Sequence, residues 1–288
     1  MAFGQQISDP FAAARAQLGT VPIQMRTLTP YLIMLSGPGG NVLVLNSPDG
    51  KIVIDTFVKP AWPGLRTALD TIGRAPVRLV INTHWHFDST DNNENFRRAG
   101  AQILAHQYTK LRLTEGRNTG GLNIPAAPAA ALPTRTFQLE DEVESYGETI
   151  KLYYVRPAHT DTDIFVHFVD NNMMHLGDVF FSSGYPVIDS ASGGSIEGML
   201  SAVDLAMKLS PNIRTRYIGG HGPLGTLNSL ERYKDMLQTV RDRVGDLQSG
   251  ARTRNQVIAL KPSRDFDDEF GHGIVPPDEF VRYVYDTL

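Results

Sequence analysis

Two histidines and an aspartate stand at alternate positions in the segment NTHWHFDSTDNN, residues 82–93. They are His84, His86 and Asp88, and the residue that follows is Ser89. Imidazole nitrogens and carboxylate oxygens are ligands that zinc and similar cations take in proteins. Alternate residues of an extended segment point the same way, so we expect His84 and His86 to bind one ion together. A bend after His86 would turn Asp88 towards a neighbouring ion.

Three further candidate ligands lie just past predicted strands, namely His159, Asp178 and His221. Side chains at strand ends are where layered α/β folds build their sites. Each of the three also has a structural explanation when it is taken alone, as a hydrogen-bonded histidine or a turn residue. We assign such structural roles to the remaining histidines, which are His106, His167, His175 and His272. The triplet of His84, His86 and Asp88, followed along the chain by these three further candidate ligands, predicts a metal site.

The chain has no cysteine. Disulfides, thiolate ligands and a cysteine nucleophile are therefore excluded, and a metal must be held by nitrogen and oxygen. We expect zinc, with manganese and iron as open alternatives because carboxylate-rich sites suit them too. A water bound to zinc has a pKa of about 7, so the expected reaction is attack of a metal-bound hydroxide on a carbonyl carbon. Asp88 is the expected catalytic residue, because it can orient this nucleophile.

The composition narrows the class of partner. The 288 residues suffice for one large domain or two small ones, and 41% are apolar and 20% charged, as in an ordinary globular protein. The net charge is −4 and no basic run suggests a nucleic-acid groove. No apolar stretch is long enough to span a bilayer. We expect a small-molecule substrate, without nucleic acid or membrane, and leave the oligomeric state open.

The sequence does not choose a compartment. The first residues, MAFGQQISDPFAAARAQLG, lack the basic-then-apolar pattern of a signal peptide. A chain trimmed to a mature start would look the same, so cytoplasm and periplasm both stay open.

Alternating strands and helices favour an α/β layered fold. In the first half, we expect successive strands over 31–57, separated by the turn signals SGPGG and SPDG. A helix over 60–73 and a strand over 77–83 should follow, and then a helix ending at Gly100 and a strand over 101–106. In the second half, we expect a strand over 149–157, a hairpin ending at Asp178, helices over 195–210 and 227–250, a strand over 215–223 and a last helix that starts with proline.

The Gly/Pro/Ala-rich connection over 116–135 is longer than most loops inside a compact domain. It is either a functional lid or a solvated excursion. Together with the SGPGG hairpin tip, this connection could line the mouth of a small-molecule site.

The segments VIDT, THWHFDSTDNNENF, PAHTDTD, HLGDVFF and GGHGP resemble the ordered motifs of the metallo-β-lactamase superfamily. The resemblance covers roughly residues 30–245. It implies a four-layer αββα sandwich with the metal site at one edge, zinc as the usual metal and hydrolysis as the usual reaction. We expect a single domain of this fold over residues 1–288, with a C-terminal helical extension from about 250.

The resemblance also implies a role for each motif residue. His84, His86 and His159 would bind the first ion, and Asp88 and His221 the second. Asp178 stands where many superfamily hydrolases place a bridging aspartate. Asp55 would orient a ligand histidine through a hydrogen bond.

One position departs from the superfamily pattern. Most of its hydrolases carry HxHxDH, whereas this chain has Ser89, and residues 91–92 replace the glycine pair that follows. Serine is a weak neutral ligand beside imidazole. The cysteine-ligand subclass of true metallo-β-lactamases also lacks that histidine, and Asp178 stands where its cysteine ligand would be. Asp88, Asp178 and His221 would then hold a second, weaker ion, and Ser89 would form hydrogen bonds near the metal.

Three functions remain open. By family analogy, the leading substrate is a cyclic amide or ester, a β-lactam or a lactone. The alternative is a thioester hydrolase resembling glyoxalase II, which Asp178 favours, while Ser89 and the lack of a dedicated C-terminal substrate domain disfavour it. A catalytically silent metal-binding protein is the third hypothesis, and Ser89 motivates it. The di-iron oxidoreductase branch replaces the second histidine with a carboxylate, so His86 argues against that branch.

Overall fold

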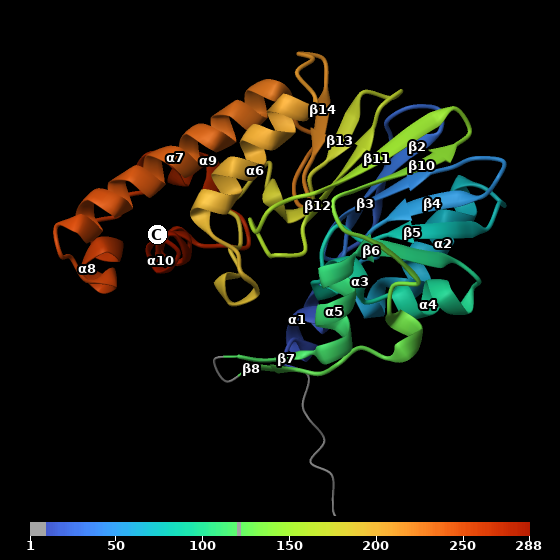
Figure 1. Cartoon of the computed structure of the whole chain (residues 1–288), viewed down its shortest axis with the longest axis horizontal. Helices are drawn as coiled ribbons and strands as arrows, with labels where there is room; N and C mark the ends of the chain where they lie inside the picture. The colour runs from blue at the N-terminus through green and yellow to red at the C-terminus, as the bar shows by residue number, and fades with distance from the viewer. Residues whose placement is uncertain (1–9, 120–121) are drawn as a thin grey trace, which may run out of the picture. The chain divides into compact units, whose positions relative to one another are not determined.

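The computed structural model describes residues 10–119 and 122–288 of the chain (Figure 1). The chain forms two compact units, with the boundary between Gln138 and Leu139. Each unit contains one large β-sheet and several helices. The α/β class expected from the alternation of strands and helices is confirmed. A single domain with a C-terminal extension stays a prediction.

The first unit is built on a seven-stranded sheet with the order β1-β2-β3-β4-β5-β6-β9. Strands β1 to β4 pair antiparallel, and β4, β5, β6 and β9 pair parallel. The strands are β1 Gln24–Thr27, β2 Leu32–Gly37, β3 Gly40–Leu45, β4 Lys51–Ile54, β5 Val77–Ile81, β6 Gln102–His106 and β9 Arg135–Phe137. The apolar run of β5 is buried at its end and leads the chain to His84.

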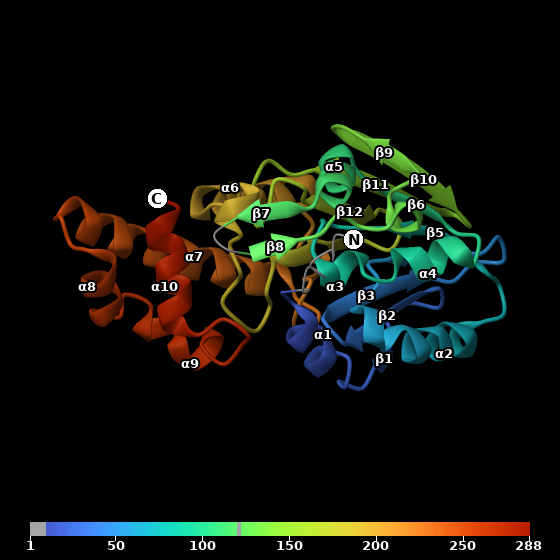
Figure 2. The same ribbon diagram turned by 90° about the horizontal axis from the view of Figure 1, so that it is seen from below.

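Helices cover one face of this sheet. Leu65 and Leu69 of α2 and Phe96 of α4 share a core cluster with valines of the strands, and Figure 2 shows α2 and α4 beside the sheet. Each such side chain contributes roughly 1.5–3 kcal/mol by leaving water. The helices of the unit are α1 Ala12–Leu18, η1 Lys59–Ala61, α2 Trp62–Ile72, α3 Phe87–Thr90, α4 Asn93–Arg98 and α5 Gln107–Glu115.

The second unit is built on a five-stranded sheet with the order β10-β11-β12-β13-β14. Its strands pair antiparallel, except that β13 and β14 pair parallel. The strands are β10 Glu140–Ser145, β11 Glu148–Tyr154, β12 Ile164–Phe168, β13 Met173–His175 and β14 Arg216–Ile218. The hairpin expected to end at Asp178 is confirmed as β12 and β13, and Asp178 follows in the 3-10 turn η3 Gly177–Val179.

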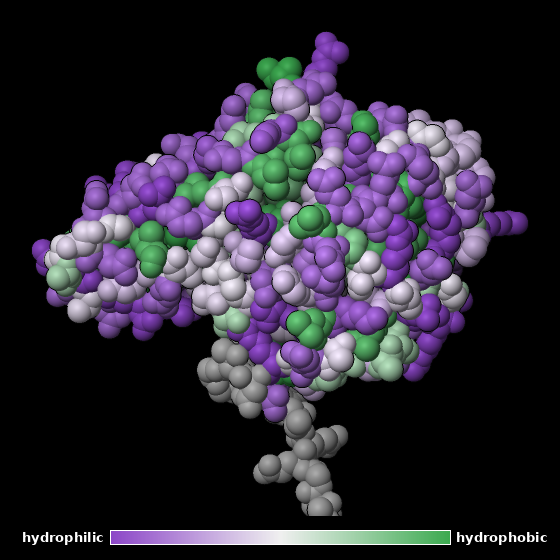
Figure 3. All heavy atoms as spheres, in the orientation of Figure 1, coloured by the Kyte–Doolittle hydropathy of each residue, from purple (hydrophilic) through white to green (hydrophobic). Residues whose placement is uncertain are grey.

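Two long helices, α6 Ile196–Leu209 and α7 Leu227–Ser249, pack side by side in the second unit (Figure 1). Helix α7 buries residues at helical spacing, namely Leu230, Tyr233, Met236, Leu237, Val240 and Val244. Its outward side is mostly hydrophilic (Figure 3). The shorter helices α8 Arg254–Ala259, α9 Asp267–Phe270 and α10 Pro277–Asp286 follow it. Within the described ranges, no helix combines the length and apolar character needed to cross a membrane.

Several short elements were not expected from the sequence. They are α1, β1, α5, β9, β10, α8, α9 and a small hairpin of β7 Arg117–Thr119 and β8 Leu122–Ile124. Most have no apolar period to detect, and β10 carries four charged or polar residues that are at least partly exposed. The hairpin lies in the 116–135 connection, whose residues 120–121 lie outside the described residues.

Candidate metal centre

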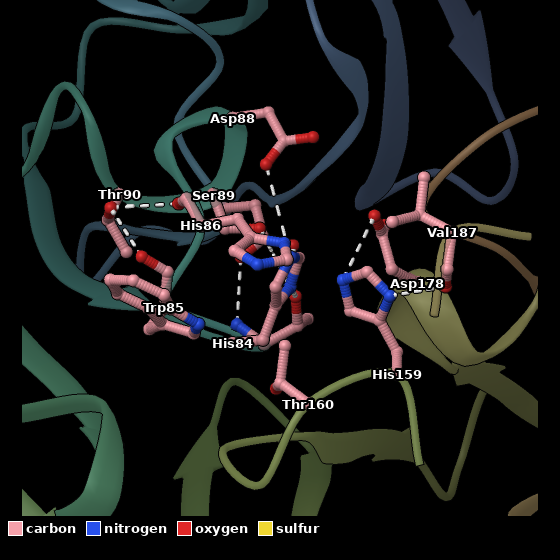
Figure 4. A network of polar contacts seen from close by, with 12 residues as sticks. His84, Trp85, His86, Asp88, Ser89, Thr90, His159, Thr160, Asp178 and Val187 are labelled. Atoms are coloured by element: carbon pink, nitrogen blue, oxygen red, sulfur yellow. Dashed lines mark hydrogen bonds and ion pairs between the residues drawn. The ribbon is translucent and has the colours of Figure 1, made fainter. Parts of the chain in front are cut away.

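The first set of candidate ligands follows β5. Residues 83–86 form bends that the sequence did not predict, although the backbone of His86 itself is extended. The expected change of direction after His86 is present, because α3 starts at Phe87. His86 caps α3, and its carbonyl accepts a hydrogen bond from Thr90 Oγ1 at 2.9 Å. The bends still gather the side chains. The rings of His84 and His86 have centroids 4.9 Å apart, and His84 Nε2 lies 3.9 Å from Asp88 Oδ1 (Figure 4).

Hydrogen bonds determine which nitrogen of His84 faces the site. The Thr83 hydroxyl donates to Asp55 Oδ2 at 2.7 Å, and the Thr83 amide donates to Asp55 Oδ1 at 2.8 Å. Thr83 Oγ1 is therefore left to accept a hydrogen bond from His84 Nδ1, 3.0 Å away. With Nδ1 protonated, Nε2 of this buried ring carries the lone pair that a cation binds.

Asp55 supports this arrangement from an unusual backbone conformation. Its φ is +64°, a region that aspartate tolerates better than most residues. Its amide donates to the carbonyl of Ile81 at 2.9 Å, which fixes the carboxylate beside Thr83. A hydrogen bond from Asp55 to a ligand histidine stays a prediction, and the part of Thr83 was not predicted from the sequence. The threonine directly before His84 was the available signal.

Ser89 contacts the same ring. Its hydroxyl oxygen lies 3.2 Å from His84 Nδ1, and the residue is 3% exposed. Nδ1 is the nitrogen on the far side of the ring from Nε2. Ser89 therefore stands where it can orient His84.

Buried amides hold the loop that carries Ser89. Asn82 Nδ2 donates to the Ser89 carbonyl at 2.8 Å. Asn92 is fully buried, and its side chain donates to three backbone carbonyls, those of Thr56, Phe57 and Val58. Asn92 thus ties this loop to the residues that follow β4.

His159 is the first candidate ligand of the second unit and is fully buried. Its Nδ1 donates to the carbonyl of Val187 at 2.8 Å (Figure 4). A carbonyl only accepts, so Nδ1 carries the proton and Nε2 is the basic nitrogen. That Nε2 lies 3.7 Å from Asp178 Oδ2.

The backbone around His159 is held on both sides. The amide and hydroxyl of Thr160 donate to Asp163 at 2.9 and 2.5 Å, and the amide of Asp189 donates to the His159 carbonyl at 3.0 Å. A Cβ at Gly194 would lie only 2.2 Å from the His159 carbonyl oxygen. Glycine is therefore needed at 194, a constraint that the sequence alone did not reveal.

Asp178 and His221 complete the second set. Asp178 is 7% exposed, and its Oδ2 lies 3.5 Å from His221 Nε2. The His221 ring stacks on Phe181, with centroids 4.6 Å apart. A Cβ at Gly220 would lie 1.9 Å from Asp178 Oδ1, so the carboxylate packs directly against the backbone. One oxygen of Asp178 thus faces two imidazoles.

The spacing of Asp178 from its two imidazoles fits a shared cation better than direct hydrogen bonds. The nitrogen-to-oxygen distances of 3.7 Å to His159 and 3.5 Å to His221 exceed the ~2.7–3.2 Å of hydrogen bonds. Two ligands at ~2.0–2.1 Å from one tetrahedral zinc lie roughly 3.3 Å apart. The donors are imidazole nitrogens and carboxylate oxygens, which suit zinc, manganese or iron. The residues present therefore fit a divalent cation.

Two of the remaining histidines have contacts with the backbone. His106 Nε2 lies 2.9 Å from the Gln138 carbonyl, and His175 Nδ1 lies 3.2 Å from the Ile218 carbonyl. Both rings are buried. These contacts agree with the structural roles assigned to them.

The chain matches the model of the metallo-β-lactamase superfamily over residues 35–221. This range is more than half of the chain and contains all six candidate ligands. The chain therefore belongs to the metallo-β-lactamase superfamily. The expected fold, with two sheets in an α/β arrangement, is confirmed, and so is the expected class of enzyme, a hydrolase.

One curated relative is a hydroxyacylglutathione hydrolase from Hyphomonas neptunium (strain ATCC 15444), 25% identical over 158 residues. The match covers 54% of this chain and 49% of the relative, so the chain spans about half the length of that protein.

Several solved structures share the fold. A metallo-β-lactamase from Pontibacter korlensis is 18% identical over 75% of this chain and 99% of its own, with a TM-score of 0.64. The metallo-β-lactamase DIM-1 is 17% identical over 76% and 99%, with a TM-score of 0.61. The inverting sec-alkylsulfatase Pisa1 from Pseudomonas sp. is 14% identical over 92% of this chain and 50% of its own, with a TM-score of 0.70.

Proposed function

We propose that this protein is a metal-dependent hydrolase of small-molecule carbonyl compounds with a binuclear metal site. The first ion would be held by His84, His86, His159 and Asp178, and the second by Asp88, Asp178 and His221. Superfamily membership supports this assignment, because all six residues lie within the matched range, residues 35–221. Zinc is the proposed metal.

The observation that carries the proposal is the position of Asp178. Its Oδ2 faces Nε2 of His159 at 3.7 Å and Nε2 of His221 at 3.5 Å. The two histidines belong to different proposed ions. A carboxylate oxygen between them suits a bridging ligand, which argues for two ions.

When bound, a divalent cation polarises the carbonyl and lowers the pKa of a coordinated water to about 7. The residues of the chain supply position and proton transfer. Asp88 has a side chain 14% exposed, and it can accept a hydrogen bond from the attacking water and take up its proton. Thr83 and the Val187 carbonyl keep the protons of His84 and His159 on Nδ1. No serine or cysteine nucleophile is required.

The leading substrate is a cyclic amide or ester, either a β-lactam or a lactone. A thioester is the second candidate. The hydroxyacylglutathione hydrolase relative and the bridging position proposed for Asp178 favour the thioester. The match covers only about half of that relative, so it does not choose between the cyclic substrate and the thioester. An experiment must separate them.

A substrate panel tests the proposal. Nitrocefin, a simple lactone and S-lactoylglutathione are offered to the protein loaded with defined zinc or manganese. We expect hydrolysis of at least one of them. Chelation and His86→Ala should each lower that rate at least about 100-fold, because both remove the cation.

The surface variant Arg98→Ala, which loses only an exposed ion pair with Glu94, should keep the wild-type rate. A metal-loaded protein that cleaves none of the three compounds would favour the catalytically silent hypothesis instead.

A further inference from the structure

Helix α1 is joined to α3 by a charged pair. Arg15 donates from Nε and Nη2 to the two carboxylate oxygens of Asp91, at 2.6 and 2.9 Å. The two side chains are only 19% and 12% exposed. Burial raises the pKa of Asp91, and the Arg15 guanidinium opposes that shift. A bidentate pair of this kind fixes both position and angle.

The same arginine also contacts the start of α3. Its guanidinium carbon lies 4.7 Å from the centroid of the Phe87 ring. Phe11 stacks on Phe87, with centroids 5.2 Å apart and an interplanar angle of 27°. Phe87 is the first residue of α3, and Asp91 is its C-cap. Arg15 therefore contacts both ends of this helix.

Other backbone segments confine α3 further. The Lys59 amide donates to Asp91 Oδ2 at 3.0 Å. A Cβ at Gly39, where φ is +93°, would lie 2.9 Å from Asp88 Cβ and 3.0 Å from Val58. A helix of four residues has no stability of its own, so these contacts must set its direction.

We propose that Arg15 is a positioning residue, which directs the Asp88 carboxylate by clamping α3 through Asp91 and Phe87. This inference rests on the proposed function, in which Asp88 binds the second ion. His86, a proposed ligand of the first ion, precedes α3 as its N-cap, whereas Asp88 lies within the helix. His84 is also held by Thr83 and Asp55, which lie outside α3. Loss of the clamp therefore affects the second ion more than the first.

Stepwise zinc titration against a chromophoric chelator tests the clamp in the full-length chain. In Arg15→Ala, we expect the Kd of the second ion to rise about 10–100-fold, the usual effect of losing a group that orients a ligand. The Kd of the first ion should stay within about threefold. Arg15→Lys keeps the charge but loses the planar fork, so it should restore only part of the second affinity.

Two further variants complete the design. Phe11→Ala removes the ring stack without touching the ion pair, and it should weaken the second ion less than Arg15→Ala does. Arg98→Ala is the control, because it breaks an exposed ion pair on α4 and should change neither affinity. Cobalt spectra of the same variants show whether the geometry of the second ion changes.

The outcomes separate the clamp from the proposed function. A wild type that binds no zinc overturns both. A wild type that binds one ion overturns the clamp and the binuclear form of the site, while the substrate panel still tests the hydrolase itself. With two ions in the wild type, an unchanged second Kd in Arg15→Ala overturns the clamp. Equal loss of both ions also overturns it, since that result indicates a general structural role. If Arg15→Ala does not fold, unchanged second affinities in Phe11→Ala and Arg15→Lys overturn it.

Discussion

The two units hold their candidate ligands in different ways. In the first unit, side chains orient the ligands, since Thr83 and Ser89 contact the His84 ring and Asp55 supports Thr83. In the second unit, the backbone does this, because the His159 ring donates to a carbonyl and Asp178 packs against Gly220. Ligand orientation in the first unit can therefore be tuned by exchange of one side chain. In the second unit, a side chain added at Gly220 would clash with the Asp178 carboxylate.

The difference follows from where the ligands lie in the sequence. His84, His86 and Asp88 come from one segment after β5, so neighbouring side chains can reach them. His159, Asp178 and His221 come from three separate segments after β11, β13 and β14. Such segments meet only if their backbones approach closely, which glycine permits.

The largest effect is expected at the glycine beside Asp178. In Gly220→Ala, the new Cβ would lie 1.9 Å from Asp178 Oδ1 and 3.0 Å from the carbonyl carbon of Gly177. The carboxylate must move, and Asp178 is a proposed ligand of both ions. We therefore expect the affinity for both ions to fall at least about 100-fold, the upper end of the effects seen when the orientation of a ligand is disturbed. Zinc titration and thermal unfolding measure the change.

Gly245→Ala is the matched control, because the nearest atom to its Cβ, Leu288 Cδ1, is 3.9 Å away. As a helix-interior change, it should stabilise the protein by about 0.8–1 kcal/mol. A Gly220→Ala protein with wild-type zinc affinity would show that the backbone does not hold Asp178 as described.

A smaller effect is expected from the supporting carboxylate of the first unit. Asp55→Asn keeps the shape of the side chain but loses the negative charge of the carboxylate that accepts the hydrogen bond from the Thr83 hydroxyl. We expect the affinity for the first ion to fall about 10–100-fold while the fold is retained. Zinc titration measures the affinity, and Asp70→Asn, on the exposed side of α2, serves as the control. Unchanged affinity would show that Asp55 and Thr83 do not orient the His84 ring.

Position 89 tests the second ion in the opposite direction. Ser89→His supplies an imidazole next to Asp88 in the chain, and we expect the second ion to bind about tenfold tighter, since imidazole is a better zinc ligand than a hydroxyl. Ser89→Ala loses only the contact with His84 Nδ1 and should weaken the first ion a few-fold, because Thr83 remains. Unchanged stoichiometry and affinity in Ser89→His would count against the assignment of Asp88, Asp178 and His221.

The smallest effect concerns the pH dependence of stability. Burial, and then the charge of Lys151 opposite it on β11, lowers the pKa of His167. The unfolded chain has the ordinary value of about 6.5 and takes up its proton first as the pH falls. His167 therefore contributes stability above pH ~6.5 that is lost as the pH falls towards its folded pKa.

Urea unfolding of His167→Gln at several pH values below ~6.5 should show a shallower loss of stability than the wild type. His272→Gln, an exposed histidine, is the control. An identical slope in His167→Gln and wild type would contradict the assignment.

Much of the fold was predictable from the sequence, because apolar runs and turn signals mark β2 to β6 and helical spacing marks α6 and α7. The candidate ligands were predictable from their types and order. The bends over residues 83–86 were not predicted, whereas the turn after His86 was, and α3 begins there at Phe87. The contact between Arg15 and Asp91 joins residues 76 positions apart, and no local pattern announces it. The bond from His159 to the Val187 carbonyl was equally unpredictable, because every residue has a backbone carbonyl and the residue type gives no signal.

The central proposal is that His84 and His159 bind the same ion. Zinc content and zinc titration of His84→Ala and His159→Ala test it most directly. We predict that each substitution alone abolishes the tightest zinc site while the protein stays folded. If either variant keeps that site at wild-type affinity, the two sets of ligands do not share an ion.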